Sequence, residues 1–194
     1  MAVPPPHSSP MMLDKPALRA KLRADRDRFA AQSSTAILAP EAFVERLRPG
    51  LTIATYCPVG SEADPTQLAA AAATAGCTLA LPFVVDRASP IRFLAWQLGE
   101  PLVAGPFSLH QPDPTSPEVA PDIILTPLVG FDRRLNRLGQ GAGHYDRAFA
   151  RYENAWRVGI AWSVQEVPAI PADIWDVPLQ AIITEEGMLW HAEK

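Results

Sequence analysis

Cysteine, histidine and long apolar runs are all scarce in this sequence of 194 residues. Two cysteines are too few for a disulfide scaffold, and the four histidines lack the spacing of a zinc site. No stretch approaches the ~18 apolar residues of a membrane span, and the N-terminus lacks the basic start and apolar core of a signal peptide. We therefore predict a cytoplasmic protein with two buried free thiols, Cys57 and Cys77, and no membrane partner.

An excess of positive charge is also absent. The net charge is -4 at pH 7, whereas proteins that coat nucleic acids usually carry excess positive charge, so no nucleic-acid partner is expected. Hydrophobic residues make up 48% of the chain and charged residues 20%, as in ordinary globular proteins. We predict a disordered tail over residues 1–13 and a single domain over residues 14–194, acting as a monomer.

Apolar runs alternate with helical patterns along most of the chain. A helix is predicted from Asp14 to about Gln32, capped by Asp14, and a proline-rich connection over residues 101–121. Strands that alternate with helices predict an α/β fold, a three-layer α/β/α arrangement with a mostly parallel central sheet. Further helices are predicted over residues 40–47, from 64–65 to 76 and after residue 143, and strands over 51–59, 77–85, 91–96, 122–131, 156–162, 177–184 and 188–190.

The most informative stretch is RLGQGAGHYD, which starts at Arg137. Its alternating glycines, Gly139, Gly141 and Gly143, can direct several N–H groups to one point, where the dipole of the following helix adds positive potential. Arg137 suits a bidentate phosphate contact, and Asp146 is a hard oxygen ligand suited to Mg²⁺. The alternative is that the glycines only make a sharp connection, with Asp146 favoured by the helix dipole. The stretch fits neither a P-loop nor a GxGxxG fingerprint.

The longer segment FDRRLNRLGQGAGHYDRAFA resembles the signature FDxxGxRLGxGxGYYDR of the 5-formyltetrahydrofolate cyclo-ligase family, also called methenyltetrahydrofolate synthetase. Further matches follow in order: KPALR, YCPVGSEADPTQL, LPFVV, RFLAW, QPDP and VGIAWSVQEVPAIPADIWDVPLQAIIT, so that the resemblance covers about residues 14–187. It implies an enzyme that converts 5-formyltetrahydrofolate to 5,10-methenyltetrahydrofolate with ATP and Mg²⁺, releasing ADP and phosphate. It also implies a scaffold related to those of sugar-phosphate isomerases and CoA transferases.

The resemblance assigns an ATP site. Lys15 and Arg19 match a family lysine and arginine that contact nucleotide phosphates, whereas we interpret Arg23 and Arg26 as a solvated basic face. Asp146 is the implied Mg²⁺ ligand. The implied ATP-binding residues are Lys15, Arg19, Arg137, Gly139, Gln140, Gly141, Ala142, Gly143, His144 and Tyr145.

A folate pocket should combine aromatic walls with a polar group for the pterin ring. Glu62 matches the family's substrate-contacting glutamate, and a carboxylate can accept paired hydrogen bonds from an amino-pyrimidine edge. On spacing alone, Glu62 could equally be a loop carboxylate near a helix start. Trp96 and Tyr145 are candidate pocket aromatics, with a core position as the alternative for Trp96, and Tyr56 is expected at the pocket base. Two later matches, Gln165 and Asp176, are given only a supporting role.

The sequence departs from the family pattern near the glycines. Gln140 and Ala142 leave the loop without a cation, and Ala142 is tolerated only if its φ is negative. His144 replaces a tyrosine and would add charge below about pH 6.5. Leu135 replaces a glycine, which suggests a different turn, and Trp175 replaces a polar residue.

Two other functions are compatible with these features. A non-catalytic folate- or nucleotide-binding paralogue would have little need of a metal ligand, so the retention of Arg137 and Asp146 favours the enzyme. A sugar-phosphate isomerase or CoA transferase would need a base beside a carbonyl site, and no such arrangement is identifiable.

Overall fold

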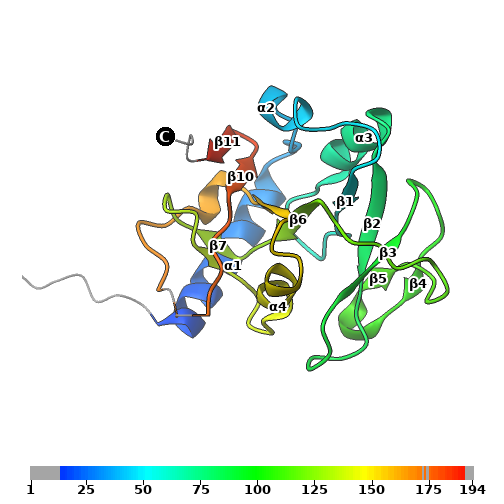
Figure 1. Ribbon diagram of the computed structural model, residues 1–194. Coiled ribbons are helices and arrows are strands. Elements are labelled where there is room, and N and C mark those ends of the chain that lie inside the picture. Colours follow the sequence, from blue (N-terminus) through cyan, green and yellow to red (C-terminus); the bar gives the residue numbers. More distant parts are fainter. Residues whose placement is uncertain (1–13, 172, 174, 191–194) are drawn as a thin grey trace, which may run out of the picture.

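The structure, a computed structural model, describes residues 14–171, 173 and 175–190. The predicted tail over residues 1–13 lies outside the described residues. Figure 1 shows the arrangement of the elements. The helices are α1 (Lys15–Gln32), α2 (Glu41–Val44), α3 (Thr66–Thr74) and α4 (His144–Arg151), with 3-10 helices η1 (Pro106–Ser108) and η2 (Ser163–Gln165). The strands are β1 (Thr52–Ala54), β2 (Thr78–Phe83), β3 (Arg92–Ala95), β4 (Val103–Ala104), β5 (His110–Gln111), β6 (Ile123–Pro127), β7 (Gly130–Phe131), β8 (Arg137–Leu138), β9 (Trp156–Ile160), β10 (Ala181–Thr184) and β11 (Gly187–Trp190).

A seven-stranded sheet forms the centre of the fold, in the order β11-β10-β9-β6-β1-β2-β3. The inner pairs β10–β9, β9–β6, β6–β1 and β1–β2 are parallel, whereas the outer pairs β10–β11 and β2–β3 are antiparallel. The inner strands are short apolar runs joined by helical segments, as parallel strands require. The predicted α/β fold with a mostly parallel sheet is therefore confirmed.

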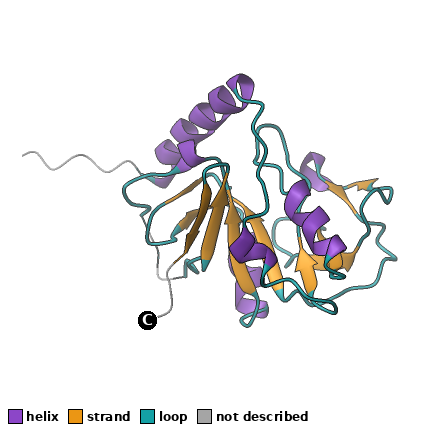
Figure 2. Cartoon of the chain, turned by 90° about the horizontal axis from the view of Figure 1, so that it is seen from above, coloured by secondary structure: helices purple, strands orange, loops and turns teal. Residues whose placement is uncertain are grey.

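Successive residues of the inner strands supply two separate cores, because side chains alternate between the faces of a sheet. Ile53 and Leu125 pack on one face with residues of α2 and α3, and Phe29 of α1 lies against the same cluster. Ala54 and Ile124 pack on the other face with residues of α4. Helices thus cover both faces, as the three-layer prediction requires, and Figure 2 shows the long helix α1 beside the sheet.

Helix α1 begins as predicted. The Asp14 carboxylate accepts a hydrogen bond from the Ala17 N–H (2.9 Å), which satisfies one of the free amides of the first turn. Its buried residues are Leu18, Leu22 and Arg26, spaced four apart on one face of the helix. The interpretation of Arg26 as part of a solvated basic face was therefore wrong: the residue is only 7% exposed, because it continues the stripe of the two leucines.

Several predicted strands are shorter in the structure. The strand predicted over residues 51–59 is regular only from Thr52 to Ala54, after which the chain leaves the sheet. Cys57 and Cys77 are free thiols as predicted, but both are half-buried instead of buried. The two-residue hairpin pairs β4–β5 and β7–β8 were not predicted, because so few residues carry no periodic pattern.

The proline-rich connection covers the outer edge of β3. The Ala95 N–H donates to the Pro117 carbonyl (2.8 Å), and the Val119 N–H donates to the Phe93 carbonyl (2.9 Å). An antiparallel bridge between Leu94 and Glu118 lies between these bonds. The last strand on this side of the sheet is therefore paired over its central residues.

Leu135 occupies a backbone conformation that favours glycine. Its φ is +65°, in the left-handed region, and its side chain is buried with 2% exposed. Two hydrogen bonds fix the turn: the Leu135 N–H donates to the Asp132 carbonyl (2.9 Å) and the Leu135 carbonyl accepts from the Leu179 N–H (3.0 Å). The leucine is thus held in a strained turn by its own burial.

The burial of the Leu135 side chain and its strained backbone predict an unusual order of stability for the alanine and glycine variants at this position. Both Leu135→Ala and Leu135→Gly lose the buried side chain, at a cost of about 2–5 kcal/mol. The glycine variant also loses the strain of the left-handed conformation, so we expect it to be more stable than the alanine variant by about 1 kcal/mol. Urea denaturation of the two variants measures the difference.

Leu138 provides the matched control. It is equally buried, with 1% exposed, but its backbone lies in the regular strand β8. At this position the glycine variant should be less stable than the alanine variant. If the alanine and glycine variants had the same order of stability at both positions, the strain proposed at Leu135 would be contradicted.

Candidate functional site

A cavity of about 940 Å³ lies where the chain leaves strands β1 and β6. Tyr56 and Cys57, just after β1, and Pro127, at the end of β6, line it. From β1 the sheet continues to β2 on one side, and from β6 to β9 on the other. The carboxyl ends of two strands that diverge in this way are the usual binding crevice of open α/β sheets. The cavity is therefore the first candidate for the functional site.

The glycine loop forms one wall of the cavity, immediately before α4. Gly141 (φ +102°) and Gly143 (φ +67°) adopt conformations that side chains disfavour, and Gly143 is the N-cap of α4. Ala142 does not have a positive φ, so its methyl group fits the loop. Within the described part of the chain, no hydrogen bond uses the N–H groups of residues 140–143. Free amides at a helix N-terminus suit an anion.

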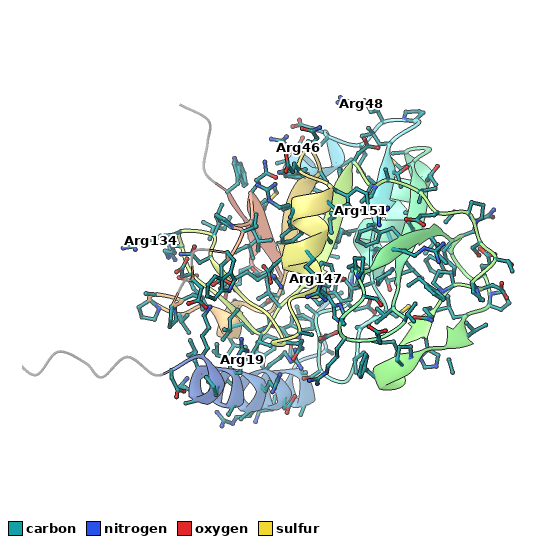
Figure 3. All side chains as sticks on the ribbon, turned by 60° about the horizontal axis from the view of Figure 1, so that its bottom comes forward. Arg19, Arg46, Arg48, Arg134, Arg147 and Arg151 are labelled. Atoms are coloured by element: carbon teal, nitrogen blue, oxygen red, sulfur yellow. The ribbon has the colours of Figure 1, made fainter. Side chains whose placement is uncertain are left out.

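Arginine side chains hold the carbonyl groups of this loop. Arg19 Nε donates to the Gly139 carbonyl (2.9 Å), and Arg147 Nη1 donates to the Ala142 carbonyl (3.0 Å). Arg147 Nη2 also donates to the Arg87 carbonyl (3.0 Å). In Figure 3, Arg19 lies on α1 and Arg147 near the start of α4, and both residues line the cavity. Sequence reasoning missed Arg87 and Arg147, although the resembled signature ends on the arginine at position 147.

Arg137 and Asp146 form an ion pair inside the cavity wall. Arg137 Nη2 lies 2.6 Å from Asp146 Oδ1, and the two side chains are 6% and 27% exposed. The Arg137 guanidinium also lies 5.9 Å from the ring centre of Tyr145 and 5.5 Å from that of Phe149. The structure thus brings the predicted phosphate ligand and the predicted metal ligand into direct contact.

Three arginines of this cavity carry a buried nitrogen without a hydrogen-bond partner in the described residues: Arg26 Nη1, Arg137 Nε and Arg147 Nε. A buried donor without a partner costs about 1–3 kcal/mol, so such groups are rare unless a ligand completes them. Arg26 Nη1 lies near the carboxylate of Glu62, whereas Arg137 and Arg147 lie beside the glycine loop, where their unpaired donors indicate an anionic ligand.

Lys15 reaches the cavity from the first turn of α1. Its Nζ lies 2.5 Å from Asp173 Oδ2 and 2.7 Å from Asp176 Oδ2. Partial burial lowers the pKa of Lys15, but the hydrogen bonds and the charges of the two carboxylates outweigh it and raise the pKa above its usual value. Burial likewise opposes, but does not cancel, the lowering of the Asp176 pKa by the Asp173 N–H and Lys15. In this state the predicted phosphate ligand Lys15 is neutralised by two acids.

The cavity wall also contains Glu62, which contacts the glycine loop through Gln140. Its carboxylate is 9% exposed, accepts hydrogen bonds from the Val59 N–H (3.0 Å) and Gln140 Nε2 (3.0 Å), and lies 3.9 Å from Arg26 Nη1. Tyr56 and Tyr145 line the same cavity, and burial, followed by the nearby charge of Glu62, raises the pKa of each phenol. Apolar side chains complete this part of the wall, among them Val84, Ile91, Phe107 and Leu109.

Two residues of the sequence prediction do not line the cavity. Trp96 packs against the core cluster that contains Ile53 and Leu125, and its Nε1 donates to the Glu100 carbonyl (3.0 Å). The structure thus places Trp96 against the core, the alternative given for it, and not in the predicted folate pocket. Gln165 is buried with 1% exposed, and its Nε2 donates to the carbonyls of Leu128 (2.8 Å) and Val129 (3.0 Å). Its role here is structural.

His144 is half-buried beside the glycine loop. Burial, followed by the charges of Arg147 and Arg87, lowers the pKa of His144 below its usual value. Its Nδ1 lies 3.0 Å from Arg147 Nη2. The imidazole therefore stays neutral to a lower pH than the 6.5 of an ordinary histidine, so that it adds no charge to the loop near neutral pH.

The described residues contain no cluster of three or more histidine, cysteine or acidic side chains that could enclose a metal ion. Mg²⁺ at phosphate sites needs no such cluster, because one or two carboxylates and the phosphates themselves usually hold it. Asp146, a partly exposed carboxylate at the edge of the glycine loop, fits this role. Among the helices that the structure describes, none has the length and apolar character of a membrane span.

Comparisons with known proteins agree with this geometry. The sequence profile of the 5-formyltetrahydrofolate cyclo-ligase family matches residues 11–185. The 5-formyltetrahydrofolate cyclo-ligase of Escherichia coli K12 is 32% identical over 140 residues, 69% of this chain and 77% of that protein. The enzyme of the same name from Haemophilus influenzae is 38% identical over 97 residues, which span 47% of this chain and 52% of its own length.

A solved structure shares the whole architecture. The NMR structure of 5,10-methenyltetrahydrofolate synthetase from Aquifex aeolicus superimposes with a TM-score of 0.71 at 26% identity, over 93% of this chain and 94% of that one. The family predicted from the glycine stretch is thus confirmed. The family profile and the shared fold cover nearly all of the described residues, and the Escherichia coli relative covers 69% of the chain: this chain belongs to the 5-formyltetrahydrofolate cyclo-ligase family.

Proposed function

We propose that this protein closes the ring of 5-formyltetrahydrofolate, giving 5,10-methenyltetrahydrofolate, ADP and phosphate at the expense of ATP. The observation that carries the proposal is the cavity itself. One part of its wall combines the free amides of residues 140–143 with buried arginine donors, and another part combines Glu62 with aromatic and apolar side chains. A polyanion and a flat, amide-rich ring system suit these two parts.

The chemistry requires the two substrates to meet. The formyl oxygen attacks the γ-phosphorus of ATP and ADP leaves, after which the nitrogen at position 10 attacks the activated carbon. When the ring forms, the phosphorylated oxygen departs as phosphate, and the proton of the nitrogen at position 10 leaves with it. A protein contributes to phosphoryl transfer mainly by positioning the groups and by stabilising the charge that develops.

The nucleotide is assigned to the glycine loop and its basic neighbours. We propose that the amides of residues 139–143 and the guanidinium of Arg137 bind the phosphates. Arg19 already fixes the loop through the Gly139 carbonyl, and Lys15 would exchange its carboxylate partners for phosphate oxygens. Three neighbours, His144, Tyr145 and Arg147, would shield this part of the cavity from water.

Mg²⁺ is proposed at Asp146, where it would neutralise phosphate charge when bound. The carboxylate now pairs with Arg137 through Oδ1. Because Arg137 is also a proposed phosphate ligand, the Arg137 guanidinium and the Asp146 carboxylate would both lie beside the bound nucleotide. Asp176, which lies near the same guanidinium, keeps Lys15 in position.

The folate is assigned to Glu62, Tyr145 and Tyr56. The carboxylate of Glu62 is fixed by two hydrogen bonds and can accept further ones from the pterin ring. Tyr56 donates its hydroxyl hydrogen to the Ala63 carbonyl (2.5 Å), so it supports the pocket base as a wall and not as a proton donor to substrate. The exposed aromatic Phe107, which the sequence analysis overlooked, lies on the same wall.

The test is direct. Purified protein is mixed with 5-formyltetrahydrofolate, ATP and Mg²⁺, and the absorbance of the methenyl product is followed, with omission of each component as a control. We expect product only when all three are present. A protein that binds ATP but forms no product would instead be the non-catalytic paralogue, whose loop lacks cations at Gln140 and Ala142. The cytoplasmic location and the monomeric state stay predictions.

A further inference from the structure

Gln140 connects helix α1 with Glu62 in the cavity wall. Its Oε1 accepts a hydrogen bond from Arg23 Nη2 (2.6 Å), and its Nε2 donates to Glu62 Oε1 (3.0 Å). The backbone of the same residue belongs to the glycine loop. One side chain therefore connects helix α1, the proposed nucleotide loop and the proposed folate ligand.

The amide is the group that this position requires. A guanidinium has only donors and an ionised carboxylate only acceptors, so their joint partner must offer both an acceptor and a donor. A lysine or arginine at position 140 would face the charge of Arg23, and a glutamate would face that of Glu62. The departure of Gln140 from the family pattern thus matches its two neighbours.

Helix α1 holds the loop at two successive residues. Arg19 binds the Gly139 carbonyl and Arg23 binds the Gln140 side chain, from positions four apart and hence on one face of the helix. Glu62 has few other contacts: the Val59 N–H, and Arg26 at 3.9 Å. A movement of the loop around a triphosphate would accordingly change the position of the Glu62 carboxylate.

We infer that Gln140 is a positioning residue that couples the binding of the two substrates, with Arg23 as its anchor. The inference rests on the proposed function. Nucleotide binding orders the loop and, through Gln140, sets Glu62 for the folate ring, and folate binding at Glu62 favours the nucleotide-ready loop. The two effects must be equal in size, because coupling between binding sites is reciprocal.

Calorimetry measures this coupling. The affinity for a non-hydrolysable ATP analogue with Mg²⁺ is determined with and without saturating 5-formyltetrahydrofolate in wild type, Gln140→Ala and Arg23→Ala. We expect folate to raise nucleotide affinity in the wild type by about fivefold or more, and both variants to bring this ratio close to one. The affinity of each variant for either substrate alone is measured in the same titrations, so that the coupling ratio is separated from any change in the affinity for a single substrate.

Matched controls separate coupling from general damage. Gln97 is an exposed glutamine outside the cavity, and Arg28 lies on α1 and pairs with Asp25. Gln97→Ala and Arg28→Ala should keep the wild-type ratio. Because Gln140 is exposed, its replacement leaves the core intact, and thermal unfolding checks this.

The outcomes are distinct. A wild-type protein that forms product but binds its substrates independently overturns the inference, as does a coupling ratio that Gln140→Ala leaves unchanged. A wild-type protein that forms no product contradicts the proposed function instead. Loss of coupling in both variants, with both controls unaffected, supports the inference.

Discussion

Replacement of Asp146 by alanine is expected to lower turnover by about 10²-fold or more. The residue lies in the first turn of α4, beside the free amides of the glycine loop, and pairs with Arg137 at 2.6 Å. As the proposed Mg²⁺ ligand, Asp146 would act on charge that develops during phosphoryl transfer. Its loss should therefore affect the turnover rate more than the free energy of unfolding. Initial rates of methenyl formation at saturating substrates measure the effect.

Two comparisons make this result specific. Asp146→Asn keeps the side-chain shape and an oxygen for Arg137 but removes the charge, and should also be strongly impaired. Asp113→Ala changes an exposed carboxylate in the proline-rich connection that does not line the cavity, and should match wild type. A rate for Asp146→Ala within about tenfold of wild type would argue against a metal ligand at this position.

Arg137→Ala should have the second large effect, on both binding and stability. Its side chain is 6% exposed and carries the proposed phosphate ligand, so we expect kcat/KM for ATP to fall by about 10²-fold or more. Removal of one member of a buried ion pair costs about 3–5 kcal/mol, and the 27% exposure of Asp146 should bring the loss of unfolding free energy to about 1–3 kcal/mol. Steady-state kinetics and urea denaturation measure the two quantities.

The double variant Arg137→Ala/Asp146→Ala distinguishes the two contributions. Without Arg137, the Asp146 carboxylate has lost its partner, and removal of that carboxylate should restore part of the stability without restoring activity. Additive losses of stability would mean that the two side chains do not depend on each other in the folded protein.

The sequence predicted the long and strongly patterned parts of this protein. Helix α1 has a cap at Asp14 and an apolar stripe, and strands such as β6 are apolar runs, so each has a local signal. The glycine stretch was recognisable because its residues are constrained one by one: Gly141 and Gly143 by backbone conformation, and Arg137 and Asp146 by charge.

The remaining site residues depend on contacts between distant segments. Trp96 directly follows strand β3 and packs against the core, whereas Glu62 lies in the loop between β1 and α3 and lines the cavity. Arg26 had a signal that was not used, its spacing of four from Leu22. Arg87 gives no such signal, because it reaches the site only through the folding of the loop after β2.

The cover over β3 also affects how copies of this protein meet. A sheet whose last strand is bare offers unpaired amides and carbonyls to the same strand of another molecule, a common route to aggregation. Here the segment around Glu118 takes up part of that edge, and its flanking prolines, Pro117 and Pro121, have no N–H with which to recruit a further strand. On this side the chain therefore resists edge-to-edge association, even when concentrated.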